Sequence, residues 1–216
     1  MRIDRLAALA IALAVLCGCD ETRFESPLGD NIETCDTHWK GLWTVDGSPK
    51  DDAGAFWIDD ECRFTVLDQP EKGAPFKEIR VPVNYVHDKG KDYVVVTDVA
   101  LKGLVELKPP YGISPPPQKA FFFARYRVRG DRMEIDRVDD QVVGRLVVES
   151  RLQGTVSKTA NELHVFVRGD RAAMLEIVRN NAIFAAKPSL TLNRSKQTPA
   201  EYEQMVIQSQ HDSKKP

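Results

Sequence analysis

Histidines and acidic clusters are the residues of this sequence with side chains suited to catalysis or metal binding. The four histidines are His38, His87, His164 and His211. None stands in an H-x-x-x-H or H-E-x-x-H relation, the spacing that places two imidazoles on one helix face around a metal. The acidic clusters lack the D-x-D-x-D-G spacing of a calcium loop; they are Asp51–Asp52, Asp59–Glu61 and Asp139–Asp140. The sequence also has no G-x-S-x-G, S-x-x-K or phosphate-loop motif. We therefore predict a protein that is not an enzyme and that has neither cofactor nor metal.

The first 18 residues have the pattern of an export signal. Arg2 and Arg5 form a charged start, and an uncharged apolar run follows from Leu6 to Leu16. These are the two regions expected before a cleavage site. The apolar run is much shorter than the ~20 residues that a transmembrane helix needs. We therefore expect residues 1–18 to be removed during export.

The signal ends in Leu16-Cys17-Gly18-Cys19, which resembles the lipobox of bacterial lipoproteins. The resemblance implies that Cys19 receives a diacylglycerol on its sulfur, that the chain is cleaved before Cys19, and that the new N-terminus is acylated. Several acyl chains together give stable anchoring. The implied location is the cell membrane, with the protein facing the periplasm. The alternative is an ordinary secretory signal that happens to end near a cysteine.

Asp20 directly follows the cysteine of the lipobox. It resembles the plus-two residue that retains lipoproteins of enterobacteria in the inner membrane. The resemblance therefore favours the inner membrane over the outer one.

Two cysteines remain once Cys17 has left with the signal and Cys19 carries lipid. In an oxidising compartment, Cys35 and Cys62 predict a disulfide. In the chain-entropy model such a bond stabilises the fold by roughly 3 to 4 kcal/mol. A free pair and a pair of metal ligands are the alternatives, and the lack of a C-x-x-C spacing disfavours the metal.

The charge of the chain argues against one class of partner. The whole sequence has 30 basic and 32 acidic residues, and the signal contributes two arginines and one aspartate. The mature chain is therefore weakly acidic, with a formal side-chain charge of -3. We expect no nucleic-acid partner. The mature length suffices for one well-buried domain.

The composition along the chain predicts three segments after the signal. Residues 19–37 are polar and broken by Pro27 and Gly29, which is typical of a flexible tether. Residues 38–194 form a β-rich globular domain. Residues 195–216 are a polar C-terminal tail, with a short helix over 199–208.

Alternating apolar and polar residues predict strands through most of the domain. The expected strands cover residues 38–45, 56–58, 62–67, 79–86, 93–97, 121–128, 133–138, 163–167 and 189–192. Pro82 indicates a sheet edge or a bulge, since proline donates no hydrogen bond to a ladder. The loop at residues 108–117 contains five prolines.

Two helices are expected late in the chain. Asp139 and Asp140 begin the first, which ends at Gly154, although its β-branched residues leave a strand as an alternative. Asp170 begins the second, which runs over residues 171–179. The fold class is therefore α+β and mainly antiparallel, as a meander or a small barrel with two helices inserted late.

Gly41-Leu42-Trp43 at the start of the first predicted strand resembles the G-x-W signature of lipocalin-like barrels. Thr97-Asp98 partly matches the second motif of that family, and Arg194 takes the place of the basic residue near the last strand. The resemblance implies a barrel closed at one end by Trp43. Its interior would be lined by Trp39, Trp43, Phe64, Val83, Tyr85 and Tyr126. The alternatives are a core tryptophan in an unrelated sheet, and an interior filled by side chains instead of a lipophilic ligand.

Two functions are compatible with these features, with a hydrolase of envelope polymers as a further alternative. The first is a membrane-tethered periplasmic protein whose non-enzymatic domain binds an envelope component or a lipophilic ligand. The second is an immunity or inhibitor lipoprotein that binds and blocks a toxin acting in the periplasm. The charged loops around Asp51, Asp59 and Pro115 are the expected contact surface in that case. An open internal cavity would favour a small ligand, and a filled core beside a charged face would favour a protein partner.

Overall fold

The computed structural model describes residues 20–47, 54–102, 117 and 119–212. The signal, Cys19, Asp51 and Pro115 lie outside the described residues, so the predictions that concern them stay predictions. The described strands are β1 (Glu21–Phe24), β2 (Gly41–Val45), β3 (Ala55–Ile58), β4 (Phe64–Asp68), β5 (Lys77–Arg80), β6 (Val83–Asp88), β7 (Lys91–Thr97), β8 (Phe121–Arg129), β9 (Arg132–Arg137), β10 (Gly154–Lys158), β11 (Leu163–Val167) and β12 (Leu190–Ser195). The described helices are η1 (Thr37–Trp39), α2 (Asp98–Leu101), α3 (Asp140–Val148), α4 (Arg171–Asn180) and α5 (Pro199–Asp212).

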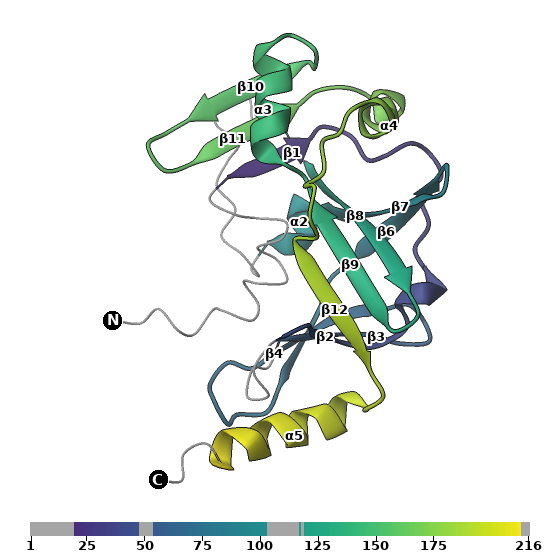
Figure 1. The fold of residues 1–216 in the computed structure, drawn as a ribbon, viewed down its shortest axis with the longest axis vertical. Coiled ribbons are helices and arrows are strands. Elements are labelled where there is room, and N and C mark those ends of the chain that lie inside the picture. Colours follow the sequence, from purple (N-terminus) through teal and green to yellow (C-terminus); the bar gives the residue numbers. More distant parts are fainter. Residues whose placement is uncertain (1–19, 48–53, 103–116, 118, 213–216) are drawn as a thin grey trace.

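The strands form one large sheet that does not close within the described residues (Figure 1). Its main path runs β6-β7-β8-β9-β12-β2-β3-β4-β5, and every pair along it is antiparallel. A second branch, β10-β11-β1, joins β8 through the pair Phe24 and Phe121. The α+β class with mainly antiparallel strands is confirmed, as are α3 and α4 late in the chain. A closed barrel is not found.

The sheet is nonetheless strongly curled, as its first core shows. Val66 of β4 and Val83 of β6 line one hollow, although seven strand-to-strand steps separate β4 from β6 along the path. At ~4.8 Å per step, a flat sheet would hold these strands more than 30 Å apart. The first core therefore gathers the inner faces of strands from both ends of the path.

A second core lies on the other face of β7 and β8, under α3 and α4. The run Tyr93–Val96 in β7 is buried on both faces, with Val94 and Val96 in the first core and Tyr93 and Val95 in the second. A continuous apolar run is what a strand covered on both sides requires. A third, smaller cluster joins Tyr202 and Val206 of α5 to β2, β3 and β4.

The N-terminal segment differs from the predicted tether. Glu21–Phe24 is a fully buried strand that pairs in parallel with β11. Its polar side chains tolerate burial because Arg23 donates to Glu21 at 2.6 Å, and the Nδ1 of His164 lies 3.1 Å from the same carboxylate. Paired charges lose much less free energy on burial than isolated ones. The chain thus joins the sheet immediately after Asp20.

Three other boundaries differ from the sequence predictions. Residues 37–39 form η1 instead of the start of a strand, because the Asp36 carboxylate accepts from the His38 backbone N–H and Gly41 turns the chain with φ of 114°. Pro82 divides the expected strand 79–86 into β5 and β6. The helix expected to reach Gly154 ends at Val148, and Gly154 begins β10.

The short helix predicted over residues 199–208 is present and longer, because α5 covers Pro199–Asp212. Thr198 and Glu201 form reciprocal bonds at its start: Glu201 Oε2 accepts from the Thr198 N–H at 2.8 Å, and Thr198 Oγ accepts from the Glu201 N–H at 3.3 Å. Tyr202 and Val206, one helical turn apart, bury the inner side against the sheet. This capping box and its apolar pair explain why residues 199–212 form a helix.

Asp140, the first residue of α3, is a buried acid, and its pKa differs between the folded and the unfolded chain. Burial, together with the negative charges of Asp20 and Asp139, outweighs Thr22 and Arg137 and raises the pKa of Asp140 to about 6. The folded-state pKa is therefore above the unfolded value. The stability that the protonated form provides is present at low pH and is lost as the pH rises from about 4 to 6.

We expect Asp140→Asn to raise the free energy of unfolding at neutral pH by up to about 3 kcal/mol, since the variant no longer ionises a buried group. Urea denaturation at about pH 4 and about pH 7.5 measures the effect, which should nearly vanish at the lower pH. Glu149→Gln removes the same charge from an exposed position and should leave both values unchanged. An Asp140→Asn variant that is less stable at neutral pH would contradict the prediction.

Candidate functional site

The six residues predicted to line a barrel interior lie together in the first core. Trp39, Trp43, Tyr85 and Tyr126 are buried there, and Phe64 and Val83 pack against them while partly exposed. The ring of Trp39 meets those of Tyr85 and Tyr126 edge-on, with centroids 5.4 and 5.0 Å apart. The structure therefore brings all six side chains to one side of the curled sheet.

The hollow that remains between these side chains is small. Its volume is about 50 Å³, and it is lined by Trp39, Phe56, Phe64, Val66, Val81, Val83, Val94, Val96, Leu101 and Ile135. An engineered apolar cavity of ~150 Å³ is needed to hold a molecule the size of benzene. Within the described residues, this side of the sheet is a packed core and not a lipid-sized cavity.

Trp43 and Arg194, two of the residues behind the lipocalin resemblance, are in contact. The Arg194 guanidinium lies over the Trp43 ring, 4.3 Å from its centroid, and also donates to the backbone carbonyls of His38 and Lys40. A Cβ at Gly41 would lie 3.3 Å from the Arg194 side chain, so a larger residue would crowd this arginine. These contacts join β2 and β12 at one end of the core.

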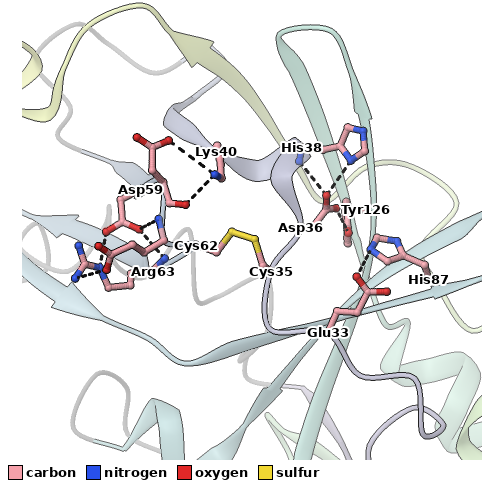
Figure 2. The surroundings of a disulfide bond; sticks show 12 residues. Glu33, Cys35, Asp36, His38, Lys40, Asp59, Cys62, Arg63, His87 and Tyr126 are labelled. Atoms are coloured by element: carbon pink, nitrogen blue, oxygen red, sulfur yellow. Dashed lines mark hydrogen bonds and ion pairs between the residues drawn. A yellow bond between two sulfur atoms is a disulfide. The ribbon is translucent and has the colours of Figure 1, made fainter.

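The predicted disulfide between Cys35 and Cys62 is present, and charged residues surround it (Figure 2). It ties the segment before η1 to the turn between β3 and β4. We call the charged surface around it the disulfide rim. Its members are Glu33, Asp36, His38, Lys40, Asp59, Asp60, Glu61, Arg63, His87 and Asp92.

Asp36 is the buried centre of one half of the disulfide rim. Its Oδ2 accepts from the Tyr126 hydroxyl, while Oδ1 accepts from the His38 backbone at 2.9 Å and lies 2.8 Å from His38 Nδ1 (Figure 2). Burial alone would raise the pKa of Asp36, but the hydrogen bonds from Tyr126 and His38 outweigh it and lower the pKa. Burial raises the pKa of Tyr126 and of nearby Tyr85, and the Asp36 charge adds to both shifts. Asp36 is therefore a carboxylate between neutral phenols at neutral pH.

His87 forms a second histidine–carboxylate pair. Its Nδ1 lies 2.8 Å from Asp92 Oδ1, and its Nε2 lies 3.9 Å from Glu33 Oε2. Burial would lower the pKa of His87, but the bond to Asp92 and the charges of Asp36, Asp92 and Glu33 raise it. Within the described residues, no hydroxyl or free thiol is hydrogen-bonded to the ring of His87 or His38. Among the described residues, neither imidazole therefore has a nucleophile hydrogen-bonded to it, and the Tyr126 hydroxyl near the first pair is bonded to Asp36 instead.

The turn between β3 and β4 forms the other half of the rim. The Asp59 carboxylate accepts from the backbone N–H groups of Glu61 and Arg63, at 3.0 and 2.9 Å, and pairs with the Arg63 side chain. Lys40 donates to the Asp60 carbonyl at 2.8 Å. The turn is thus fixed internally while the side chains of Asp60 and Glu61 stay exposed, at 103% and 72%. The rim as defined has six carboxylates against two permanent cations, Lys40 and Arg63, so it is acidic overall.

A larger hollow of about 530 Å³ lies on the opposite face of β8, between the start of α3 and the end of α4. Lys91, Arg125 and Arg179 line it together with Asp139 and Phe184. Arg125 is paired with Asp136 at 2.7 Å, and Arg179 is paired with Asp88 at 2.7 Å. Most of the positive charge there is neutralised locally, so this hollow shows no clear preference for an anion.

Sequence reasoning identified the disulfide and Asp59 but missed Asp36, His87 and Asp92. His87 and Asp92 face each other in the β6–β7 hairpin register, which the turn between those strands already implied. Asp36 and Tyr126 are 90 residues apart in the sequence, so no local sequence pattern predicts their contact.

Comparisons with protein-family models, with curated proteins and with solved structures find no match for this chain. Among the described residues, no group of three or more histidine, cysteine or acidic side chains is arranged to hold a metal ion. No helix in the described part of the chain has the length and apolar character needed to cross a bilayer.

Proposed function

We propose that this chain is a lipoprotein, anchored in the cell membrane through Cys19 and facing the periplasm, with a non-enzymatic domain that binds another protein at the disulfide rim. The lipobox at Leu16–Cys19 supports the anchor. Asp20 in the plus-two position supports retention in the inner membrane. In the part of the chain that the structure describes, no hydroxyl or thiol is hydrogen-bonded to the ring of His38 or His87, which supports binding without turnover.

The packed first core is the observation that favours a protein partner over a lipophilic ligand. A hollow of about 50 Å³ is well below the ~300 to 1,000 Å³ of typical small-molecule sites. A lipocalin-like architecture is compatible with this proposal, since the interior of a small barrel can be filled by its own side chains. Binding is then expected at the outer surface.

The chemistry of the disulfide rim indicates the kind of partner. Its excess of carboxylates favours a basic surface on the partner, because complementary charge accelerates encounter and disfavours wrong partners. The disulfide, the Asp36 bonds and the Asp59 turn fix the rim before binding. A preorganised surface loses less conformational entropy on association.

An immunity or inhibitor lipoprotein is a specific form of this function. A rigid acidic surface that needs no cavity suits a protein that blocks a basic site on a toxin in the periplasm. A neighbouring gene for a secreted toxin and a stoichiometric complex with its product would support this form. The general proposal does not depend on it.

Reversing two exposed charges tests the binding surface. We expect Asp60→Lys combined with Glu61→Lys to reduce recovery of the partner from the periplasm by about tenfold or more, since each change places like charges opposite each other. Quantitative mass spectrometry of proteins crosslinked to the chain in cells measures the recovery. Salt should weaken binding of the wild-type protein.

The matched control is Asp30→Lys combined with Glu149→Lys, which changes net charge equally at exposed positions away from the rim. This control should recover the partner as the wild-type protein does. Equal recovery by both double variants would refute the rim as the binding surface. Saturable, stoichiometric binding of a fluorescent fatty acid would instead support the lipophilic ligand.

A further inference from the structure

The residue expected to carry the lipid is separated from the folded domain by Asp20 alone. β1 begins at Glu21, directly after Asp20, and all four residues of β1 are buried. Neighbouring Cα atoms are only ~3.8 Å apart, so Cys19 has almost no freedom to move away from the domain. The sequence predicts a tether over residues 19–37, but residues 21–24 of that range form a buried strand.

Asp20 is itself fixed to two other elements. Its Oδ1 accepts from the Leu163 backbone N–H at 2.8 Å, and its Oδ2 accepts from Gln141 Nε2 at 3.0 Å. Leu163 is the first residue of β11, and Gln141 lies in the first turn of α3. The carboxylate therefore joins the starts of three elements at one place, which we call the anchor end of the domain.

β1 is held too firmly to act as a tether by peeling away. It pairs with β11 over four registered residues, from Glu21 opposite His164 to Phe24 opposite Val167. The Phe24 ring is fully buried and stacks on Phe123 with centroids 4.1 Å apart. The Glu25 N–H continues the pairing by donating to the Val167 carbonyl at 3.0 Å. Releasing the strand would expose the ring and break these bonds together.

We infer that the domain is docked on the bilayer surface by its anchor end, with the turn between β10 and β11 and the first turn of α3 facing the lipid headgroups. This inference rests on the proposed lipid anchor at Cys19. Because β1 and β11 are parallel, the start of β1 lies beside the β10–β11 turn. The exposed residues there are Lys158, Thr159, Ala160 and Asn161, a polar tip with a single cation that suits a headgroup layer.

This orientation places the rest of the domain at a distance from the membrane. α5 lies at the other end of the molecule's long axis from β10 and β11 (Figure 1). β2, β3 and β4 lie in the same half as α5 (Figure 1), and the turn between β3 and β4 carries Asp59, Asp60, Glu61 and Arg63 of the disulfide rim. Docking by the anchor end therefore brings the β10–β11 turn closest to the bilayer and leaves β2, β3, β4 and α5 outside the docked surface.

Fluorescence quenching in vesicles tests the orientation. The lipidated protein is reconstituted in vesicles of phosphatidylethanolamine and phosphatidylglycerol that contain a lipid with a nitroxide on its headgroup. One chain carries a fluorophore on Ala160→Cys at the anchor end, and another carries it on Gln204→Cys, an exposed position of α5. We expect severalfold stronger quenching at residue 160 than at residue 204.

A chain with a lengthened connection is the matched control. About twelve Gly and Ser residues followed by an additional Asp are inserted after Asp20, which gives a flexible spacer and keeps Asp both after Cys19 and before Glu21. This insertion should remove the difference between residues 160 and 204, while the circular dichroism spectrum stays that of the unmodified protein. Equal quenching at both positions in the lipidated chain without the insertion would overturn the docked orientation.

Failure of the anchor itself is distinguishable from failure of the docking. Mass spectrometry should show lipid on residue 19 of the wild-type chain, and Cys19→Ala should leave the protein outside the membrane fraction. A wild-type chain without lipid at residue 19 would overturn the anchor and the docking together. A lipidated chain with equal quenching would overturn the docking alone.

Discussion

Replacing Trp43 with alanine is expected to lower the free energy of unfolding by about 3 to 5 kcal/mol, a large share of the ~5 to 15 kcal/mol of a typical domain. The side chain is fully buried in the first core, and its Nε1 donates to the Trp39 carbonyl at 2.7 Å. Its loss would leave a cavity and remove the surface on which Arg194 lies. Urea denaturation followed by circular dichroism measures the change.

Trp57 provides the matched control for Trp43. It lies on the next strand, β3, but is only partly buried, against the small cluster under α5. Trp57→Ala should therefore cost clearly less than Trp43→Ala. Equal losses in the two variants would show that the first core does not dominate the stability of the domain.

Replacing both Cys35 and Cys62 with serine is expected to lower the free energy of unfolding by roughly 3 to 4 kcal/mol. The two cysteines are 27 residues apart, and opening this loop restores conformational entropy to the unfolded chain. For a domain of this size the loss corresponds to roughly 10 °C in the melting temperature. Differential scanning calorimetry measures the shift.

The wild-type protein in the presence of a reductant is the control for the serine variant. Its melting temperature should fall to that of the variant, whereas the reductant should leave the variant unchanged. A melting temperature of the serine variant equal to that of the oxidised wild-type protein would refute a stabilising role for the bond.

The hairpins were predictable because their determinants are local. β8 and β9 alternate apolar and polar residues on both sides of the turn at Gly130, and the structure pairs them as expected. The N-caps of α3 and α4 were also predictable from the sequence. Asp139 and Asp170 each accept a hydrogen bond from the backbone N–H of the residue three positions later. Turn and cap chemistry depends on residues close in sequence, so a single sequence contains it.

The elements that were missed depend on distant partners or on paired charges. The β1 segment was predicted to be a polar tether because Glu21 and Arg23 are charged. In the structure these two side chains form a buried ion pair. α5 was predicted only as a short helix over residues 199–208 because its apolar residues are few, although the Thr198–Glu201 capping box was visible in the sequence. Within the described residues the sheet curls but does not close. This shape depends on contacts between strands at opposite ends of the sheet, and the alternation of apolar and polar residues does not predict such contacts.

The candidate site was predictable in part. The lipocalin resemblance implied that six residues share one interior, and the structure gathers these six in the first core. The disulfide followed from the compartment that the lipobox implies. The acidic centre at Asp36 did not, because its partner Tyr126 belongs to a strand far along the chain. Local patterns thus identify which side chains point inward but not which distant polar groups meet.

The pairing of the first strands with the last ones has a consequence for the order of folding. Glu21 in β1 lies opposite His164, 143 residues later, and Thr44 in β2 lies opposite Asn193, 149 residues later. Such a high contact order is typical of slow folding. A chain exported with its N-terminus first, as we propose, cannot complete this sheet until β11 and β12 have crossed the membrane. Under the proposed export, late completion would keep the chain in a form that the export machinery can thread, and final folding would wait for the arrival of the C-terminal third in the periplasm.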